Sequence, residues 1–162
     1  MPTDTFSGVR LATQADEGPI FDLLVMLYEE NALFQMASAK VRATIEHATR
    51  GKGGLIGLID GKTGPEGSVG MAIEQFWYSD QSVLVEHWNF VHPKHRKTTH
   101  AKRLIEFAKW CSDRLELPLV MGIMSSVRTE AKVRLYRRQM PLLGAFFGHG
   151  LPVGIMQHSK AA

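Results

Sequence analysis

The segment Val91-His92-Pro93-Lys94-His95-Arg96-Lys97-Thr98-Thr99-His100-Ala101 decides how the rest of this sequence is interpreted. A strand pattern over 83–91 stops at His92-Pro93, and an amphipathic stretch begins at Ala101, so the segment joins an expected strand to an expected helix. The first N–H groups of a helix have no partner within the helix, so such a loop presents free donors to an anion. Four basic side chains surround it: Lys94, Arg96, Lys97 and Lys102. The segment therefore predicts a phosphate or pyrophosphate site, although it has neither the Gly-Lys-Ser/Thr of a P-loop nor the glycines of a dinucleotide fingerprint.

On either side of this segment the sequence alternates between strand and helix patterns. Strands are expected over 8–14, 55–59, 68–78, 83–91, 119–124, 142–147 and 153–156, and helices over 17–31, 37–50, 101–115 and 128–138. Hairpins in the middle require antiparallel pairing, while the helical crossover from 83–91 to 119–124 permits a parallel pair. The nearly continuous apolar run over 119–124 predicts a central strand buried on both faces. The fold class is therefore α/β, with a mixed sheet and helices on both faces.

Composition limits the class of protein further. A length of 162 residues with 44% hydrophobic and 22% charged residues predicts one globular domain over 1–162. No apolar run is long enough to cross a membrane, and the N-terminus lacks the pattern of a signal peptide. The lone cysteine, Cys111, excludes an internal disulfide and favours a cytoplasmic location. A net charge of +3 is mildly basic and does not by itself indicate a nucleic-acid partner.

The segment after 83–91 resembles motif A of the GNAT superfamily of N-acetyltransferases. Val91 and Pro93 match the strand end of that motif, Arg96 matches its Arg/Gln, Ala101 matches its final small residue, and Leu104-Ile105 match the first apolar pair of its helix. The order of elements over 8–147 is also similar to that of the family.

Four positions depart from the family's pattern. Thr99 stands where the central glycine is usual and Lys97 where a further glycine is common, so their side chains crowd a pyrophosphate unless they bind it themselves. Leu135-Tyr136 matches the family's Leu-Tyr, but Met140-Pro141 replaces the Gly-Phe that usually follows. The runs 88–93 and 105–110 also resemble acetyltransferases carried by tailed phages and prophages.

The resemblance implies that acetyl-CoA, as cosubstrate, lies between the fourth and fifth expected strands, 83–91 and 119–124, which are parallel and splayed apart. It implies pantetheine pairing near Phe90 and Val91, pyrophosphate on the N–H groups of 96–101, and a backbone donor near Val91 for the oxyanion. It implies Tyr136 as the general acid for the departing thiolate. The cofactor-binding residues expected on this basis are Phe90, Val91, Arg96, Lys97, Thr98, Thr99, His100, Ala101 and Lys102.

Transfer to an amine also requires a base, because amines are mostly protonated at neutral pH. Glu86 and His87 are the candidates, and adjacent strand residues face opposite sides, so at most one is expected to point into the cleft. In a regular strand His87 shares a face with Asn89 and Val91, and Glu86 shares one with Trp88 and Phe90. His87 is slightly preferred, because an unperturbed imidazole changes its charge near neutral pH. A bulge in this strand, which the family usually has, would invalidate the face assignment.

The sequence supports other functions as well. The same fold could bind acyl-CoA or a partner without catalysis, as a sensor or adaptor, and the departures at Thr99 and Met140-Pro141 motivate that alternative. A nucleic-acid-binding module with two basic helices is a third reading, without the interleaved aromatic and basic residues that would support it. His92, His95 and His100 lack tight metal-ligand spacing, so no metal is expected. The apolar stretch 142–147 predicts a homodimer. The acceptor amine stays open.

Overall fold

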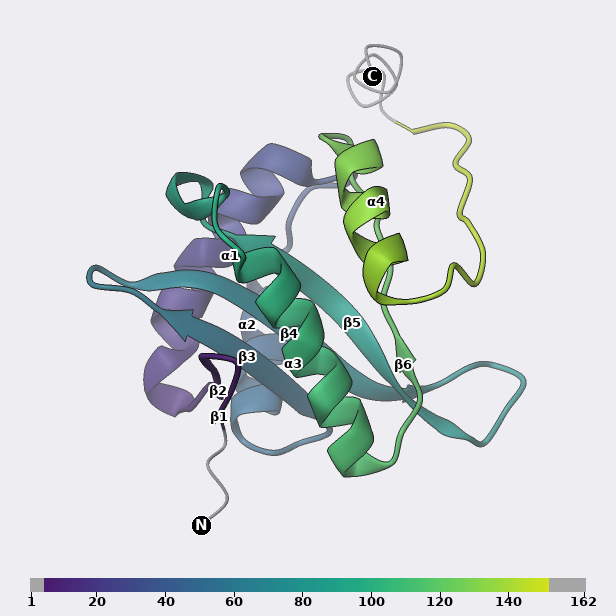
Figure 1. Cartoon of the computed structure of the whole chain (residues 1–162), viewed down its shortest axis with the longest axis horizontal. Coiled ribbons are helices and arrows are strands. Elements are labelled where there is room, and N and C mark those ends of the chain that lie inside the picture. The colour runs from purple at the N-terminus through teal and green to yellow at the C-terminus, as the bar shows by residue number, and fades with distance from the viewer. Residues whose placement is uncertain (1–4, 152–162) are drawn as a thin grey trace.

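The computed structural model of the chain describes residues 5–151 (Figure 1). In chain order the elements are β1 (Thr5–Phe6), β2 (Val9–Leu11), the 3₁₀ turn η1 (Gln14–Asp16), α1 (Glu17–Asn31), α2 (Ser38–Thr49), β3 (Gly54–Asp60), β4 (Pro65–Gln75), β5 (Ser82–Val91), the 3₁₀ turn η2 (Pro93–His95), α3 (His100–Leu115), β6 (Leu119–Val120) and α4 (Thr129–Gln139). The expected helices are confirmed to within one or two residues.

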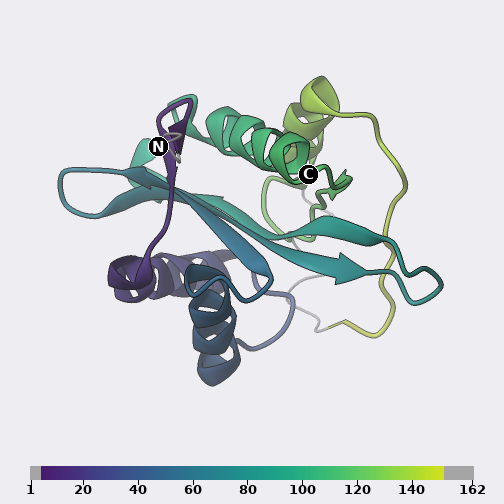
Figure 2. The same cartoon turned by 90° about the horizontal axis from the view of Figure 1, so that it is seen from below.

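The described strands form one sheet in the order β1-β2-β3-β4-β5-β6. Each neighbouring pair is antiparallel except β5 and β6, which are parallel. The predicted mixed, mostly antiparallel α/β architecture is therefore confirmed, including the parallel crossover through α3. Figure 2 shows α1 and α2 covering one face of the sheet, while α3 and α4 lie on the other.

Each face of the sheet has its own apolar core. On the α3 side the buried residues include Leu84, Leu104 and Phe107, and on the α1–α2 side they include Ile20, Leu24 and Trp88. The buried residues of α1 and α3 recur at helical spacing, so each helix has one apolar face that packs on the sheet. Burial of that face stabilises the helix.

Two glycines allow aromatic rings to pack directly on the strands. A Cβ at Gly57 would lie 2.6 Å from the ring of Phe107, and a Cβ at Gly70 would lie 2.3 Å from the ring of Trp88. The Trp88 indole N–H donates to Ser68 Oγ at 3.1 Å, so this buried ring also has its polar atom paired. Phe107 thus lets α3 approach β3 closely, and the ring of Trp88 in β5 lies over the neighbouring strand β4.

Three strand predictions are wrong. The run 119–124 is paired only at Leu119–Val120, and it lies at the edge of the described sheet rather than at its centre. Residues 142–147 form no strand, and the large apolar side chains there are 60–96% exposed. The strand expected over 68–78 ends at Gln75, so Phe76, Trp77 and Tyr78 belong to the turn that follows. The strand expected over 153–156 lies outside the described residues.

Cys111 is a buried side chain of the α3 core. Burial raises the pKa of its thiol to about 12, so the thiolate is scarce at neutral pH. This agrees with a packing role. No helix in residues 5–151 has both the length and the apolar character needed to span a bilayer.

Candidate functional site

β5 and β6 diverge after a short parallel pairing. The paired positions are Leu84 with Leu119 and Val85 with Val120, and Leu84 N–H donates to Pro118 O at 2.8 Å. β5 then continues to Val91, while the chain after Val120 leaves the sheet. Within the described chain, the edge of β5 beyond Val85 therefore faces an opening instead of another strand.

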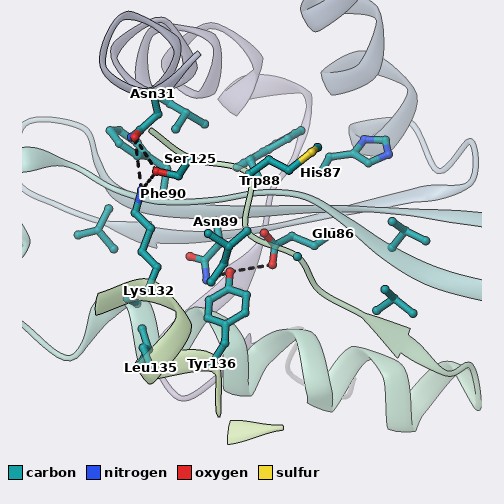
Figure 3. A pocket seen from close by; sticks show the side chains of 18 of the residues that line it. Asn31, Glu86, His87, Trp88, Asn89, Phe90, Ser125, Lys132, Leu135 and Tyr136 are labelled. Carbon is teal, nitrogen blue, oxygen red and sulfur yellow. Dashed lines mark hydrogen bonds between the residues drawn. The ribbon is translucent and has the colours of Figure 1, made fainter. Parts of the chain in front are cut away.

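A bulge lies in β5 where the opening begins. Gly70 of β4 is opposite Trp88, but the next residue, Met71, is opposite Glu86, so His87 is an extra residue in the ladder. Figure 3 shows His87 and Trp88 on the α1–α2 side of β5, and Glu86 with Asn89 on the side of α4. The assignment of His87 to the face of Asn89 and of Glu86 to the face of Trp88 is therefore wrong, because the bulge shifts the alternation by one residue.

The opening contains a cleft of about 550 Å³ that wraps around the edge of β5; we call it the β5 cleft. Its walls come from α1, the β4–β5 hairpin, β5, the loop before α3, the segment 120–125 and α4. Glu86, His87 and Tyr136, the three expected catalytic residues, all line it. The expectation that at most one of Glu86 and His87 would point into the cleft is therefore wrong, because the cleft wraps around the edge of β5 and reaches both of its sides. Residues far apart in the sequence thus converge on one site.

On the α4 side, Glu86, Tyr136 and Asn89 form a hydrogen-bonded chain (Figure 3). The Tyr136 hydroxyl donates to Glu86 Oε2 at 2.8 Å, and Asn89 Nδ2 donates to the Tyr136 oxygen at 3.1 Å. Burial raises the pKa of Glu86 to about 8, against the smaller opposing effect of the Tyr136 hydrogen bond. Burial and the neighbouring carboxylate also raise the pKa of Tyr136 well above its usual value. Both groups therefore carry their protons at neutral pH.

On the opposite side, His87 is oriented by Glu74 of β4. His87 Nε2 lies 2.7 Å from Glu74 Oε1, and the two side chains are 34% and 46% exposed. An imidazole held at one nitrogen by a carboxylate leaves the other nitrogen available for proton transfer. His87 is thus a solvent-accessible, oriented histidine, whereas Glu86 is enclosed.

The expected cofactor-binding residues are only partly brought together. Phe90, Val91, Arg96, Thr98 and Ala101 line the β5 cleft. The side chains of Lys97, Thr99 and Lys102 are exposed, and they are not part of the cleft lining. His100 is buried and turned away from the cleft, toward Glu66.

The loop reaches its shape without left-handed backbone. Within 5–151 the non-glycine residues with positive φ are Ser7, Glu116 and Arg128, and Thr99 has φ −86°. The side chains at Lys97 and Thr99 are therefore compatible with the loop's conformation. Glycine is not required there for the backbone angles.

Arg96 is already engaged by an acidic residue of α1. Its guanidinium pairs with Glu30 Oε2, and both side chains are about a quarter exposed. The guanidinium also lies 5.8 Å from the centre of the Phe90 ring. A ligand phosphate at Arg96 would meet the Glu30 carboxylate.

Asn31, Ser125 and Lys132 form a hydrogen-bonded group near Arg96 that the sequence did not predict. Ser125 Oγ donates to Asn31 Oδ1 at 2.8 Å, and Lys132 Nζ donates to Ser125 Oγ at 2.7 Å (Figure 3). Burial lowers the pKa of Lys132, although Glu30 partly opposes this. These contacts join the end of α1 to the start of α4 across the β5 cleft. Only the basic character of 128–138 was visible beforehand.

One buried atom in the site has no partner. Asn89 Oδ1 is buried without a hydrogen bond among the described residues. A buried acceptor left unpaired is costly, so a donor brought by a ligand would satisfy it. Pantetheine carries two amide N–H groups. The orphan acceptor, the open edge of β5 and the start of α3 together fit CoA.

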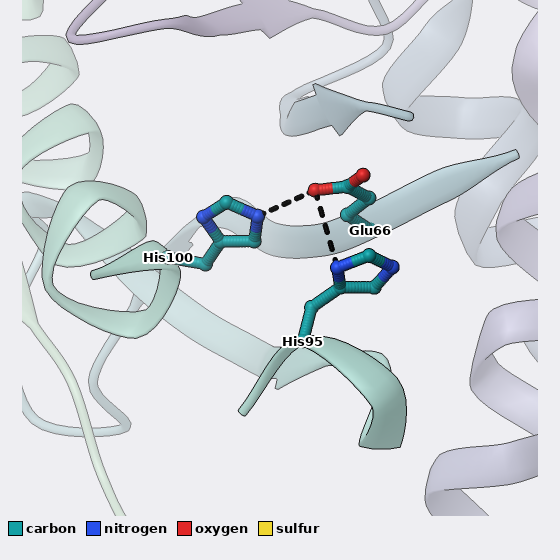
Figure 4. A group of neighbouring side chains, drawn as sticks. All are labelled: Glu66, His95 and His100. Carbon is teal, nitrogen blue, oxygen red and sulfur yellow. Dashed lines mark hydrogen bonds and ion pairs between the residues drawn. The ribbon is translucent and has the colours of Figure 1, made fainter. Parts of the chain in front are cut away.

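Glu66, His95 and His100 form a cluster at the margin of the β5 cleft, and His95 also lines the cleft (Figure 4). Glu66 Oε2 lies 2.6 Å from His100 Nε2 and 3.5 Å from His95 Nδ1. Arg103 NH1 lies 3.1 Å from His100 Nδ1, and arginine can only donate, so His100 carries its proton on Nε2 and donates it to Glu66. A metal ion bound at Nε2 would move the imidazole proton to Nδ1, where this N–H would face the Arg103 N–H donor. The cluster therefore suits a hydrogen-bonded anchor for the start of α3 better than a metal site.

No protein-family model matches this sequence, and no similar sequence is found among the curated proteins. Solved structures do match the fold. A probable acetyltransferase has a TM-score of 0.68 at 18% identity, covering 90% of this chain and 97% of its own. AAC(6')-Iy in complex with the bisubstrate analog CoA-S-monomethyl-acetylneamine has a TM-score of 0.67 at 14% identity, covering 87% and 95%. A GNAT family acetyltransferase from Staphylococcus aureus has a TM-score of 0.61 at 16% identity, covering 88% and 97%. The fold of this chain is that of the GNAT acetyltransferases.

Proposed function

We propose that this chain, with its GNAT acetyltransferase fold, transfers an acetyl group from acetyl-CoA to an amine by direct attack. The observation that carries the proposal is the β5 cleft, which joins an open strand edge, the start of a helix and a proton-carrying pair, Glu86 and Tyr136. The solved neighbours support the same class of chemistry, and one of them was solved with a CoA bisubstrate analog. The acceptor is taken up in the next subsection.

Acetyl-CoA would supply a thioester whose carbonyl carbon the amine attacks. The chain's own part is to bind and orient it. The free N–H groups at the start of α3 and the Arg96 guanidinium would hold the pyrophosphate. The open edge of β5 near Phe90 and Val91 would pair with pantetheine, and Asn89 Oδ1 would accept one of its amide N–H groups.

Two proton transfers are assigned to opposite sides of β5. His87, held by Glu74, takes the proton of the attacking amine. Glu86 holds its proton in most molecules at neutral pH, because burial raises its pKa to about 8, and it is already hydrogen-bonded to Tyr136. Tyr136 donates its proton to the departing thiolate, and the protonated Glu86 beside it restores that proton. Of the two candidate bases, we therefore assign the role to His87.

The alternative is a chain that binds acyl-CoA without turnover. It is favoured by the Glu30–Arg96 ion pair, which occupies the expected phosphate-binding arginine, and by the side chains at Lys97 and Thr99. Both functions require CoA binding, and only the first requires thiol release that depends on an amine.

The test combines thermal unfolding with a transfer assay. CoA at about 100 times its Kd should stabilise the chain by roughly 2.7 kcal/mol, which raises Tm by roughly 5–10 °C. Acetyl-CoA with a panel of primary amines should release free thiol faster than acetyl-CoA alone. No thermal shift at millimolar CoA would overturn both functions. A shift without amine-dependent thiol release would favour the non-catalytic binder.

A further inference from the structure

Acidic and basic residues are separated between two consecutive segments that line the β5 cleft. Residues 63–93, which contain the whole β4–β5 hairpin, hold four acidic residues and no lysine or arginine. Residues 94–103, which follow directly, hold five basic residues and no acidic one. The basic segment is at the end of the cleft assigned to phosphate. At the opposite end, on the hairpin, the carboxylates are Glu74 and Asp80. Of the other two acidic residues, Glu66 contacts His95 and His100 at the basic end, and the pKa of Glu86 is raised to about 8 by burial.

Three aromatic side chains project from the tip of this hairpin. Phe76, Trp77 and Tyr78 are 45%, 95% and 71% exposed. The rings of Phe76 and Tyr78 are stacked with centroids 5.9 Å apart, and Trp77 packs edge-on against Tyr78 at 5.6 Å. Figure 1 shows the hairpin extending beyond the rest of the sheet. An exposed apolar group of this size marks a binding surface more often than a solvated turn.

The aromatic tip is connected to the proposed reaction site. Phe76 and Glu74 both line the β5 cleft, and Glu74 is the residue that holds His87. Gln75 Nε2 donates to the main-chain oxygen of Asp80 at 2.7 Å, which fixes the turn and leaves the Asp80 carboxylate outside any ion pair among residues 5–151. The tip thus combines aromatic rings with two carboxylates a few residues from His87.

Aromatic faces and carboxylates both attract cations. A carboxylate on the ligand would be repelled by the carboxylates and would gain nothing from the aromatic faces. Glu74 and Trp77 are three residues apart, and the chain turns over 76–79, so their Cα atoms are at most roughly 10 Å apart. An aliphatic diamine or a polyamine is long enough to bridge such a separation.

We propose that the acceptor is a di- or polyamine: one amine reacts beside His87, and a second positive charge binds between the aromatic tip of the hairpin and the carboxylates of Glu74 and Asp80. This inference rests on the proposed acetyl transfer. It adds the chemical class of the acceptor and the subsite that selects it.

Three amines of matched length test the proposal: cadaverine with a cationic tail, pentylamine with a neutral tail and 5-aminovalerate with an anionic tail. We expect kcat/KM to fall about tenfold at each step in that order, and the differences to shrink in high salt. Asp80→Asn and Trp77→Ala should reduce the preference for cadaverine over pentylamine about tenfold. Asp113→Asn, an exposed carboxylate on α3, is the matched control and should leave the order intact.

A binding measurement separates this inference from the proposed transfer. Titration with cadaverine should change the tryptophan emission of the wild type but not of Trp77→Phe, and 5-aminovalerate should change neither. Equal kcat/KM for the three amines would overturn the cation subsite and leave acetyl transfer in place. Absence of transfer together with a cadaverine-specific change at Trp77 would overturn transfer and keep the subsite. If Trp77→Ala alters self-association in sedimentation and leaves the amine order unchanged, the tip is a contact between copies and the proposal is wrong.

Discussion

Glu86 should make the stability of the chain depend on pH in a way that one substitution removes. In the folded chain the pKa of Glu86 is raised by burial from 4.5 to about 8. Between these values the unfolded chain has released this proton and the folded chain has kept it. Since the unfolded state then binds fewer protons, the free energy of unfolding falls as pH rises through this window and levels off above about pH 8.

The size of the effect follows from the number of protons. A difference of one proton changes stability by at most about 1.4 kcal/mol per pH unit. Solvent reaches the β5 cleft, which reduces the effect, so we expect a loss of roughly 1–3 kcal/mol between pH 5 and pH 8.5. For a chain of this length that corresponds to roughly 2–12 °C in Tm.

Glu86→Gln is the matched variant, because its side-chain oxygen can still accept the Tyr136 hydrogen bond while its charge is fixed at zero. Urea unfolding of both proteins should be measured at half-unit steps of pH. Histidines and other groups titrate in both, so they cancel in the difference. We expect the wild type to lose stability relative to the variant as pH rises. Parallel curves, within about 0.3 kcal/mol, would show that Glu86 ionises normally and would remove the reason for preferring His87 as base.

Three further predictions concern the site and the surface. Arg96→Ala should weaken CoA binding by roughly 1.5–3 kcal/mol in calorimetry, and Glu30→Gln should strengthen it, because the competing carboxylate is gone; equal affinities in all three proteins would mean that Arg96 serves only the ion pair. Tyr136→Phe should bind acetyl-CoA normally while kcat falls about 10²–10⁴-fold; an unchanged kcat would leave water as the proton donor. Leu143→Asp with Phe147→Asp should convert a dimer to a monomer in sedimentation, and a wild type that is only monomeric at high concentration would contradict the expected pairing through 142–147.

Local signals predicted the helices well. The helix expected over 17–31 is Glu17–Asn31, because Pro19 fits its first turn and Ile20, Leu23 and Leu24 repeat at helical spacing on the buried face. The helix α3 was clear for the same reason. An amphipathic helix is specified by residues close in sequence, so one chain is enough to recognise it.

The strand predictions failed where a partner strand decided the outcome. The run 142–147 is as apolar as a strand, but among the described residues no strand pairs with it, and its side chains stay exposed. The run 119–124 is paired at two residues and then leaves the sheet. A run of hydrophobic residues shows that a segment can be buried, but whether it pairs as a strand depends on which other segments lie beside it.

The sequence predicted where several residues of the candidate site lie along the chain, but not how they contact one another in the fold. The loop before α3 and Tyr136 were identified from the local motif and the family resemblance. The bulge that places Glu86 with Asn89 is set by the pairing of β4 with β5, and single-residue alternation cannot show it. Asn31 contacts Ser125 and Lys132 across separations of 94 and 101 residues, which no spacing rule could reveal.

The short pairing of β5 with β6 also divides the chain into parts of unequal local stability. The backbone of the segment from Leu119 through α4 pairs with the sheet at two strand positions only, and the side-chain hydrogen bonds of Tyr136 with Glu86 and Asn89 add to this attachment. No residue of α4 is fully buried. Amide hydrogens there should exchange with solvent through openings that leave the rest of the sheet intact. The β5 cleft can thus admit a long ligand by local detachment of one unit, and a ligand that bridges β5 and β6 would slow exchange across both. We therefore expect the binding of such a ligand and the closure of this segment onto β5 to be thermodynamically coupled.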